Sequence, residues 1–317
     1  MDIGIFILAS FFAVNMGSSS FAASMATACG SGAISVRNAK ILYIFLIVAG
    51  AVRFGSEVSH TLSKGIIPSS LIDVKALVVI LSVASLSLFT ANIMHIPQST
   101  SLSTVAAISG VGAFYSQISF AKINFLLICW VGSTVISFLL IYAATRYIYP
   151  PRKLNFWIYE CLVNHKDRLT WFVILTSLYN VFSQGSNNVP NVVGPLVAAG
   201  FIDTDKGLWL MGLIFGLGAF VFTGPMKTTS ERIVPLGLLT ATIINFISGT
   251  ITLLASKLGI PQPAVIIYTM AIYAIGSIKN GPAITMSNPL TRKTFFTWCI
   301  NPVITFGLSY FLAKLFL

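Results

Sequence analysis

The chain has 317 residues, of which 56% are hydrophobic and only 9% are charged, and its formal net charge is +11. Soluble domains contain about 25% charged residues, so this composition excludes an ordinary soluble domain and predicts an all-α integral membrane protein. The basic excess then indicates cytoplasmic loops, which are enriched in lysine and arginine, rather than a nucleic-acid partner. The four cysteines have neither CxxC nor histidine-paired spacing, so no metal site, disulfide or cofactor is expected.

The first apolar stretch, Ile3 to Met16, is about 21 Å long as a helix and is too short to cross a bilayer alone. Gly17 to Ser20 interrupts it, and a second short piece runs from Phe21 to Gly30. We expect either a re-entrant hairpin or one broken helix, because periodicity does not choose between them. Ala39 to Phe54 then predicts a spanning helix.

Two titratable residues, Glu57 and His60, follow this spanning segment. One interpretation places them at an interfacial helix end, where charged side chains extend toward water. The other places them on a proton or ion path, because ionisable residues inside a membrane are usually functional.

Leu71 to Met94 predicts another spanning helix, and Pro97 to Ser101 interrupts the apolar sequence a second time. Hydroxyl and glycine residues at helical spacing favour close helix packing. A run of hydroxyls that opens a helix just after a proline also suits an anion, because free backbone N–H groups point outward there. Both interpretations stay open. Ile123 to Tyr147 completes the first half.

Residues 146–168 form the only long polar connection, with more basic than acidic side chains. This excess predicts a cytoplasmic linker. The linker divides the chain into a first transmembrane repeat, residues 1–145, and a second transmembrane repeat, residues 169–317.

The second half contains the most unusual segment, Gly185 to Pro195, which places three asparagines, two prolines and two glycines between apolar neighbours. Irregular backbone at membrane depth survives only where protein buries it or water lines it. Broken helices that end at the midplane form the binding sites of many secondary transporters. We therefore expect this segment to supply half of a substrate site.

The two halves align when the chain is shifted by 168 positions. Matched positions are Gly17-Ser18 with Gly185-Ser186, Trp130 with Trp298 and, after a four-residue deletion, Pro97-Gln98 with Pro261-Gln262. The polar interruptions therefore occur in pairs, which indicates a transporter site between repeats and favours alternating access over a pore. Counting each short pair as one broken crossing gives five crossings per half, which predicts inverted repeats with both chain ends outside.

The stretch 184–195 and the Pro-x-Ser-Thr-Ser sequence that starts at Pro97 resemble the inorganic phosphate transporter (PiT) family. Each repeat of that family carries a Gly-x-Asn-Asp-x-Ala-Asn motif and a later Pro-x-Ser-Thr-Thr motif. The resemblance covers essentially the whole chain, and it implies a homodimeric membrane transporter for an inorganic anion.

The departures from the family motifs concern the substrate. Ser19-Ser20 stands where the first motif has Asn-Asp, and Asn188 stands where the second has Asp. The second Pro-x-Ser-Thr-Thr copy, at Pro263-Ala264-Val265, has lost every hydroxyl. With both aspartates gone, the pattern resembles the sulfate permease branch of the family.

Sulfate at neutral pH has no proton to donate, whereas phosphate keeps a P–OH donor for much of the time, since its pKa is about 6–7 by analogy with phosphate monoesters. A buried carboxylate accepts that proton's hydrogen bond but repels a fully ionised anion. A sulfate site should therefore present donors only. The residues that fit this requirement are Ser18, Ser19, Ser20, Ser99, Thr100, Ser101, Asn187, Asn188 and Asn191.

The sequence thus predicts a secondary active transporter, an ion-coupled symporter that imports inorganic sulfate across the plasma membrane by alternating access. Phosphate or another tetrahedral oxyanion (thiosulfate, molybdate or sulfite) is the alternative substrate. No HExxH, GxSxG, paired-carboxylate or Ser/His/Asp pattern indicates an enzyme. The resemblance implies sodium binding by the motif aspartates and asparagines, but the aspartates are absent. Protons are the alternative coupling ion, with Glu57 or Glu231 as carriers.

Overall fold

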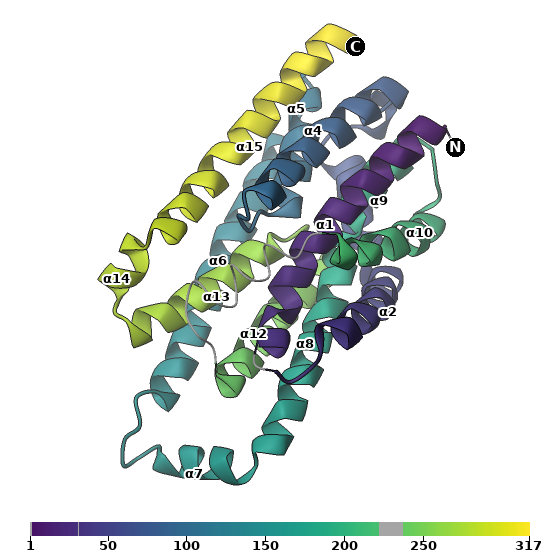
Figure 1. Ribbon diagram of the computed structural model, residues 1–317. Coiled ribbons are helices and arrows are strands. Elements are labelled where there is room, and N and C mark those ends of the chain that lie inside the picture. The colour runs from purple at the N-terminus through teal and green to yellow at the C-terminus, as the bar shows by residue number, and fades with distance from the viewer. Residues whose placement is uncertain (1, 31, 222–236) are drawn as a thin grey trace.

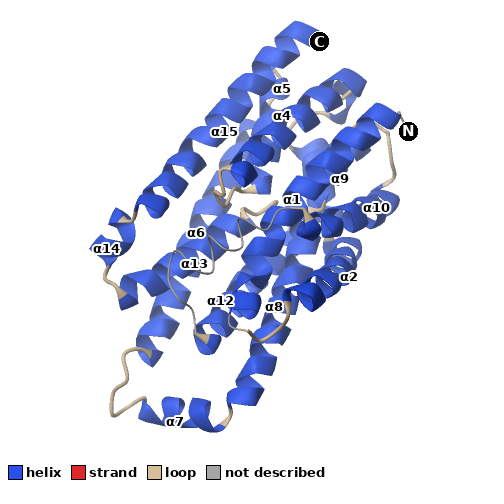
Figure 2. Ribbon diagram, viewed as in Figure 1, coloured by secondary structure: helices blue, strands red, loops and turns tan. Residues whose placement is uncertain are grey.

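The computed structural model describes residues 2–30, 32–221 and 237–317, which form helices joined by loops, with no β-strand in these ranges (Figures 1 and 2). Five of the described helices are long and apolar enough to cross a membrane. A sixth crossing results if Val36–Phe54 and Ser56–Gly65, which meet at 67°, count as one bent span. The predicted all-α membrane architecture is confirmed.

The first half consists of two helices, a bent segment, a helical hairpin and one long helix. Its elements are α1 Ile3–Gly30, α2 Val36–Phe54, α3 Ser56–His60, the π-helix η1 Thr61–Gly65, the 3-10 helix η2 Ser69–Leu71, α4 Val74–Ile93, α5 Thr100–Phe114 and α6 Phe120–Ile148. The helices predicted at 39–54, 71–94 and 123–147 are therefore confirmed to within a few residues.

The linker contains the short helix α7, Phe156–Asn164, and leads into the second half. The described elements that follow are α8 Lys166–Asn188, α9 Pro190–Ala198, α10 Thr204–Leu217, the 3-10 helix η3 Gly218–Phe220, α12 Leu238–Lys257, α13 Ala264–Lys279, α14 Pro282–Ser287 and α15 Pro289–Phe316. In Figure 1, α7 lies at one end of the bundle and both chain ends lie toward the other.

The expected interruption at Gly17 to Ser20 is wrong, because α1 is one continuous helix of 28 residues. A helix satisfies its backbone hydrogen bonds internally, so serines do not break it in apolar surroundings. Ser24 Oγ donates back to the carbonyl of Ser20 at 2.9 Å. Gly17 instead permits a close helix crossing, since a Cβ at this position would collide with the carbonyl of Phe215 in α10.

The interruption in the second half is shorter than expected. Helix α8 continues through Gly185 and ends at Asn188, and α9 begins at Pro190 after the single residue Val189. Proline explains the boundary, because it has no N–H to continue the hydrogen bonds of α8 and its fixed φ suits the first turn of a helix. Gly185 packs against the carbonyl of Ile47 in α2 and, like Gly17, allows a close crossing.

Two helical hairpins meet inside the bundle. Residues 94–99 join α4 to α5 and form the first tip, and residues 258–263 join α12 to α13 and form the second tip. A tryptophan from a long helix of the other half holds each tip. Trp298 of α15 donates to the carbonyl of Pro97 at 2.8 Å, and Trp130 of α6 donates to that of Pro261 at 2.7 Å.

Candidate functional site

A chain of buried hydrogen bonds connects α1, α5, α8 and α9. Asn188 donates from Nδ2 to Ser20 Oγ at 2.9 Å and accepts at Oδ1 from Thr100 Oγ1 at 3.2 Å. Asn191 donates from Nδ2 to Thr100 Oγ1 and to Ser101 Oγ, both at 3.2 Å. Each of these side chains is 2% exposed or less. We call these five residues the polar cluster.

Three helix beginnings meet at the polar cluster. Thr100 and Ser101 open α5, and Asn191 is the second residue of α9. Ser101 Oγ also donates at 2.9 Å to the carbonyl of Gln262, two residues before α13. The first N–H groups of a helix have no partner within it and form the positive end of its dipole. The arrangement therefore favours an anion.

The polar cluster is electrically neutral. Among the described residues, no charged side chain takes part in its hydrogen bonds, which join only hydroxyl and amide groups. Two nearby amide oxygens, Asn191 Oδ1 and Gln98 Oε1, are buried without a hydrogen-bond partner. Because an unpaired buried oxygen is costly, these two atoms are suited to accept from water or to contact a cation.

Three of the predicted serines lie beside the polar cluster rather than in it. Ser18 is buried in α1. Ser19 Oγ donates to the carbonyl of Gln98 at 3.4 Å. Ser99 caps α5, since its hydroxyl accepts from the backbone N–H of Leu102 at 3.2 Å, as expected for a residue that opens a helix.

Asn187 contacts the second tip instead of the polar cluster. Its Nδ2 donates to the carbonyl of Ile260 and to Ser256 Oγ, both at 3.0 Å. Its Oδ1 accepts from the backbone N–H of Gln262 at 2.7 Å. Both amide hydrogens and the amide oxygen are thus engaged by protein.

The two predicted ion-coupling residues are not joined to the polar cluster by any described contact. Glu57 is exposed in the first turn of α3. Glu231 lies outside the described residues.

The sequence-based prediction missed the side chains that hold the hairpin tips. Trp130 and Trp298 were matched as equivalent positions, yet nothing in the sequence indicated which backbone groups they contact. Ser133 of α6 also went unnoticed, although its Oγ donates to Gln262 Oε1 at 3.1 Å. The recurrence of tryptophan at the 168-residue offset was the signal for Trp130 and Trp298, whereas Ser133 has Asn301 at that offset and gave no signal.

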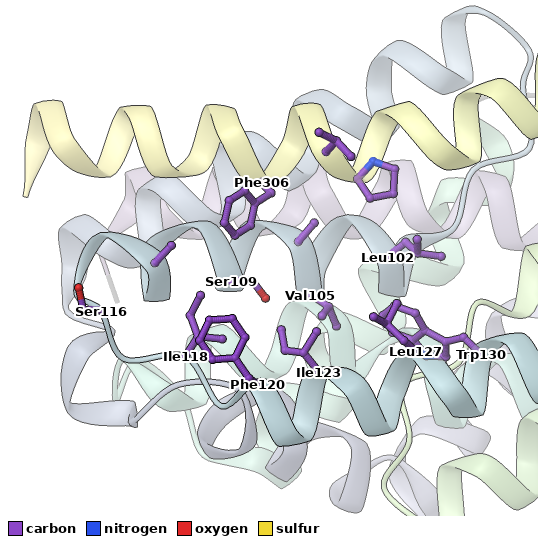
Figure 3. Close-up of a pocket in the computed structure, with 14 residues that line it drawn as sticks. Leu102, Val105, Ser109, Ser116, Ile118, Phe120, Ile123, Leu127, Trp130 and Phe306 are labelled. Carbon is purple, nitrogen blue, oxygen red and sulfur yellow. The ribbon is translucent and has the colours of Figure 1, made fainter.

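A separate cavity of about 650 Å³ lies between α5, α6 and α15 (Figure 3). Its lining includes Leu102, Val105, Ile123, Leu127 and Phe306 and is mostly apolar. Such a surface offers few donors to an inorganic anion, so the polar cluster is the better candidate site.

Comparison with known proteins decides the family. The sequence profile described as the phosphate transporter family matches residues 16–309. The chain belongs to the phosphate transporter family. This family member is 33% identical over 320 residues to the sulfate permease CysP of Bacillus subtilis (strain 168), an alignment that covers 100% of the chain and 88% of CysP. It is 24% identical over 384 residues to the putative phosphate permease TK2061 of Thermococcus kodakarensis, with 95% and 94% covered.

The fold of this family member also matches a solved structure, described as the sodium-dependent phosphate transporter. The TM-score is 0.84 at 24% sequence identity, and the match covers 98% of this chain and 97% of the other. The protein is therefore a transporter and not an enzyme, and its apolar helices make it a multi-pass membrane protein.

Proposed function

We propose that this protein imports inorganic sulfate as an ion-coupled symporter. The observation that carries the proposal is Asn188, which stands where the PiT motif has an aspartate and lies in the polar cluster between Ser20 and Thr100. A neutral amide at this position can donate to a dianion, whereas a carboxylate would repel it. The resemblance to a sulfate permease supports the same substrate.

The anion is bound by donors that now bond to one another. The Nδ2 groups of Asn188 and Asn191 and the hydroxyl of Thr100 turn from their present partners toward sulfate when it arrives. The backbone N–H groups of Thr100 and Ser101, which open α5, add charge stabilisation from the positive end of that helix. Phosphate, the alternative substrate, carries a proton that would need an acceptor, and among the described residues the polar cluster offers neutral amide oxygens such as Asn191 Oδ1 but no carboxylate.

Transport proceeds by alternating access between two inverted repeats. Ser20 and Asn188, which bond to each other, are 168 residues apart. The contact of Gly17 with the Phe215 carbonyl has a counterpart in that of Gly185 with Ile47, because both members are displaced by the same 168 positions. Such pairing supports an approximate two-fold axis through the polar cluster. The position of α7 opposite both chain ends supports inversion (Figure 1).

The remaining parts of the proposal concern orientation, driving ion and assembly. The protein lies in the plasma membrane as a homodimer. The basic linker around α7 faces the cytoplasm. Either sodium or protons drive uptake. The unpaired oxygens Asn191 Oδ1 and Gln98 Oε1 support a bound cation, while Glu57 and Glu231 remain the candidate proton carriers.

Uptake by purified protein in lipid vesicles tests the proposal. Vesicles receive labelled sulfate with an inward sodium gradient, a proton gradient or neither, and unlabelled phosphate, thiosulfate, molybdate and sulfite compete in turn. Sulfate uptake that needs one gradient and resists excess phosphate is the expected result. Uptake of phosphate in preference to sulfate would contradict the assignment.

A further inference from the structure

The polar cluster is closed to solvent, so an anion reaches it only if a covering element moves. Every residue of the cluster is 2% exposed or less. The two hairpin tips lie against it, since Thr100 and Ser101 directly follow the first tip and Ser101 contacts Gln262 in the second. One of the two tips could therefore open the path to the cluster, and the hydrogen bonds that hold each tip indicate which one moves.

The second tip, residues 258–263, is fastened at its backbone from several directions. Asn187 binds it twice, at the Ile260 carbonyl and the Gln262 N–H, with distances of 3.0 and 2.7 Å. Ser101 Oγ donates to the Gln262 carbonyl at 2.9 Å, and Ser133 Oγ donates to the Gln262 side chain at 3.1 Å. Gln262 thus has partners for its N–H, its carbonyl and its side-chain oxygen.

The first tip, residues 94–99, lacks the equivalent contacts. Ser19 is matched to Asn187 and makes one long hydrogen bond, 3.4 Å to the Gln98 carbonyl. Val265 is matched to Ser101 and has no hydroxyl to donate. Gln98 Oε1, matched to the oxygen that Ser133 satisfies, is buried without a partner. The first tip thus receives fewer side-chain hydrogen bonds than the second, although α4 is tied to α1 just before it, where Asn92 Nδ2 donates to the Asn15 carbonyl at 3.0 Å.

The two tips share two further kinds of contact, although only the first has a serine cap, at Ser99, where the second has Pro263. Within the first tip, His95 N bonds to the Asn92 carbonyl at 3.1 Å, and within the second, Gly259 N bonds to the Ser256 carbonyl at 3.0 Å. The tryptophan bonds to Pro97 and Pro261 also match, at 2.8 and 2.7 Å. The asymmetry lies in the side chains that reach each tip from α1, α5, α6 and α8.

We propose that the first tip is the moving gate of the polar cluster and that Asn187 is a positioning residue that holds the second tip in place. The role of a gate rests on the proposed transport function, whereas the difference in hydrogen bonds between the tips does not. The amide of Asn187 bonds to the backbone of the second tip and to Ser256 of α12, and to no member of the polar cluster, so its role is to hold this tip against α8. Ser19 lacks the amide that would fasten the first tip in the same way, and it lines a narrow crevice with Ala22 and Pro97.

Hydrogen–deuterium exchange on the full-length protein in lipid nanodiscs tests this assignment. Exchange at 94–99 and at 258–263 is measured for the wild type, for Asn187→Ser and for Ser19→Asn, and protection factors correct for intrinsic rates. In the wild type, the first tip should be protected at least about tenfold less than the second, the factor that corresponds to about 1.4 kcal/mol. Asn187→Ser should lower protection of the second tip by a similar factor, and Ser19→Asn should raise protection of the first.

Equal protection of the two tips in the wild type would overturn the proposal, as would unchanged protection of 258–263 in Asn187→Ser. These two measurements test the gate assignment even if Ser19→Asn does not fold. Calorimetry adds a second criterion, because Asn187→Ser should keep its sulfate dissociation constant within about threefold of the wild-type value. If Asn187→Ser lost as much sulfate affinity as Asn191→Ser, Asn187 would be an anion ligand and not a positioning residue. Exchange is measured without an anion, so failure of sulfate to bind would refute the proposed function and leave the gate comparison intact.

Discussion

Replacing Asn188 with aspartate would restore the family carboxylate and should sharply weaken sulfate binding. The new carboxylate would lie where the amide now contacts Ser20 at 2.9 Å and Thr100 at 3.2 Å, inside a cluster that is 2% exposed or less. At ~4 Å and an effective dielectric near 20, its repulsion of one anionic charge is about 4 kcal/mol before relaxation, or roughly a thousandfold in affinity. Ser20→Asp together with Asn188→Asp should weaken sulfate binding further.

Asn188→Ser is the matched control, because it removes the same amide without adding charge. It should lose one charge-assisted donor, about 1.5–3 kcal/mol, so the aspartate variant should bind sulfate far more weakly than the serine variant. Lowering the pH should restore sulfate binding in Asn188→Asp but not in Asn188→Ser, since protonation of the new carboxylate removes its repulsion of sulfate.

Isothermal titration calorimetry on purified protein measures these affinities for sulfate and for phosphate. The aspartate variant should shift the preference toward phosphate, whose proton it can accept. If Asn188→Asp bound sulfate as tightly as the wild type, or as tightly as Asn188→Ser, the donor-only account of the polar cluster would be wrong.

Three further outcomes are expected. Cysteines introduced at Ser35 and at Asp203, which are equivalent at the repeat offset and both exposed, should react with impermeant reagents from opposite sides of the membrane; labelling from one side would replace inverted repeats with parallel ones. Thr100→Ala should weaken sulfate binding roughly 10- to 150-fold by calorimetry, while Ala264→Ser should change it little; equal effects would remove the hydroxyls of α5 from the site. Gly185→Val should lower the melting temperature by several degrees, because its Cβ would collide with a backbone carbonyl that cannot move aside; an unchanged melting temperature would mean that the close crossing does not contribute to stability.

Hydropathy and motif spacing predict much of this fold and the neighbourhood of the site. Long apolar segments predict spanning helices directly, because a helix that crosses the bilayer needs an apolar segment as long as the bilayer is thick. The match of Gly17-Ser18 with Gly185-Ser186 predicted that the two polar interruptions meet, and the structure joins Ser20 to Asn188, which share the same offset, at 2.9 Å. Thr100 and Ser101 lie at a helix start, as the proline and hydroxyl pattern predicts.

Other features depend on tertiary contacts that spacing does not contain. Gly17 to Ser20 has the composition of a break, yet close crossing with α10 and bonding within the helix make it continuous. Asn187 and Asn188 are adjacent in sequence, but they contact different elements because successive helical residues point about 100° apart. Which of the two meets the polar cluster follows from the packing of α8, and sequence alone cannot show it.

The most direct test of the central claim locates the bound anion. Selenate is a tetrahedral dianion like sulfate, and its selenium gives an anomalous X-ray signal. Crystals grown with selenate should show one anomalous peak at the meeting point of α5, α9 and α13, with its oxygens about 3 Å from donors of Thr100, Asn188 and Asn191. A peak elsewhere, with none at these residues, would contradict the assignment of the polar cluster as the anion site.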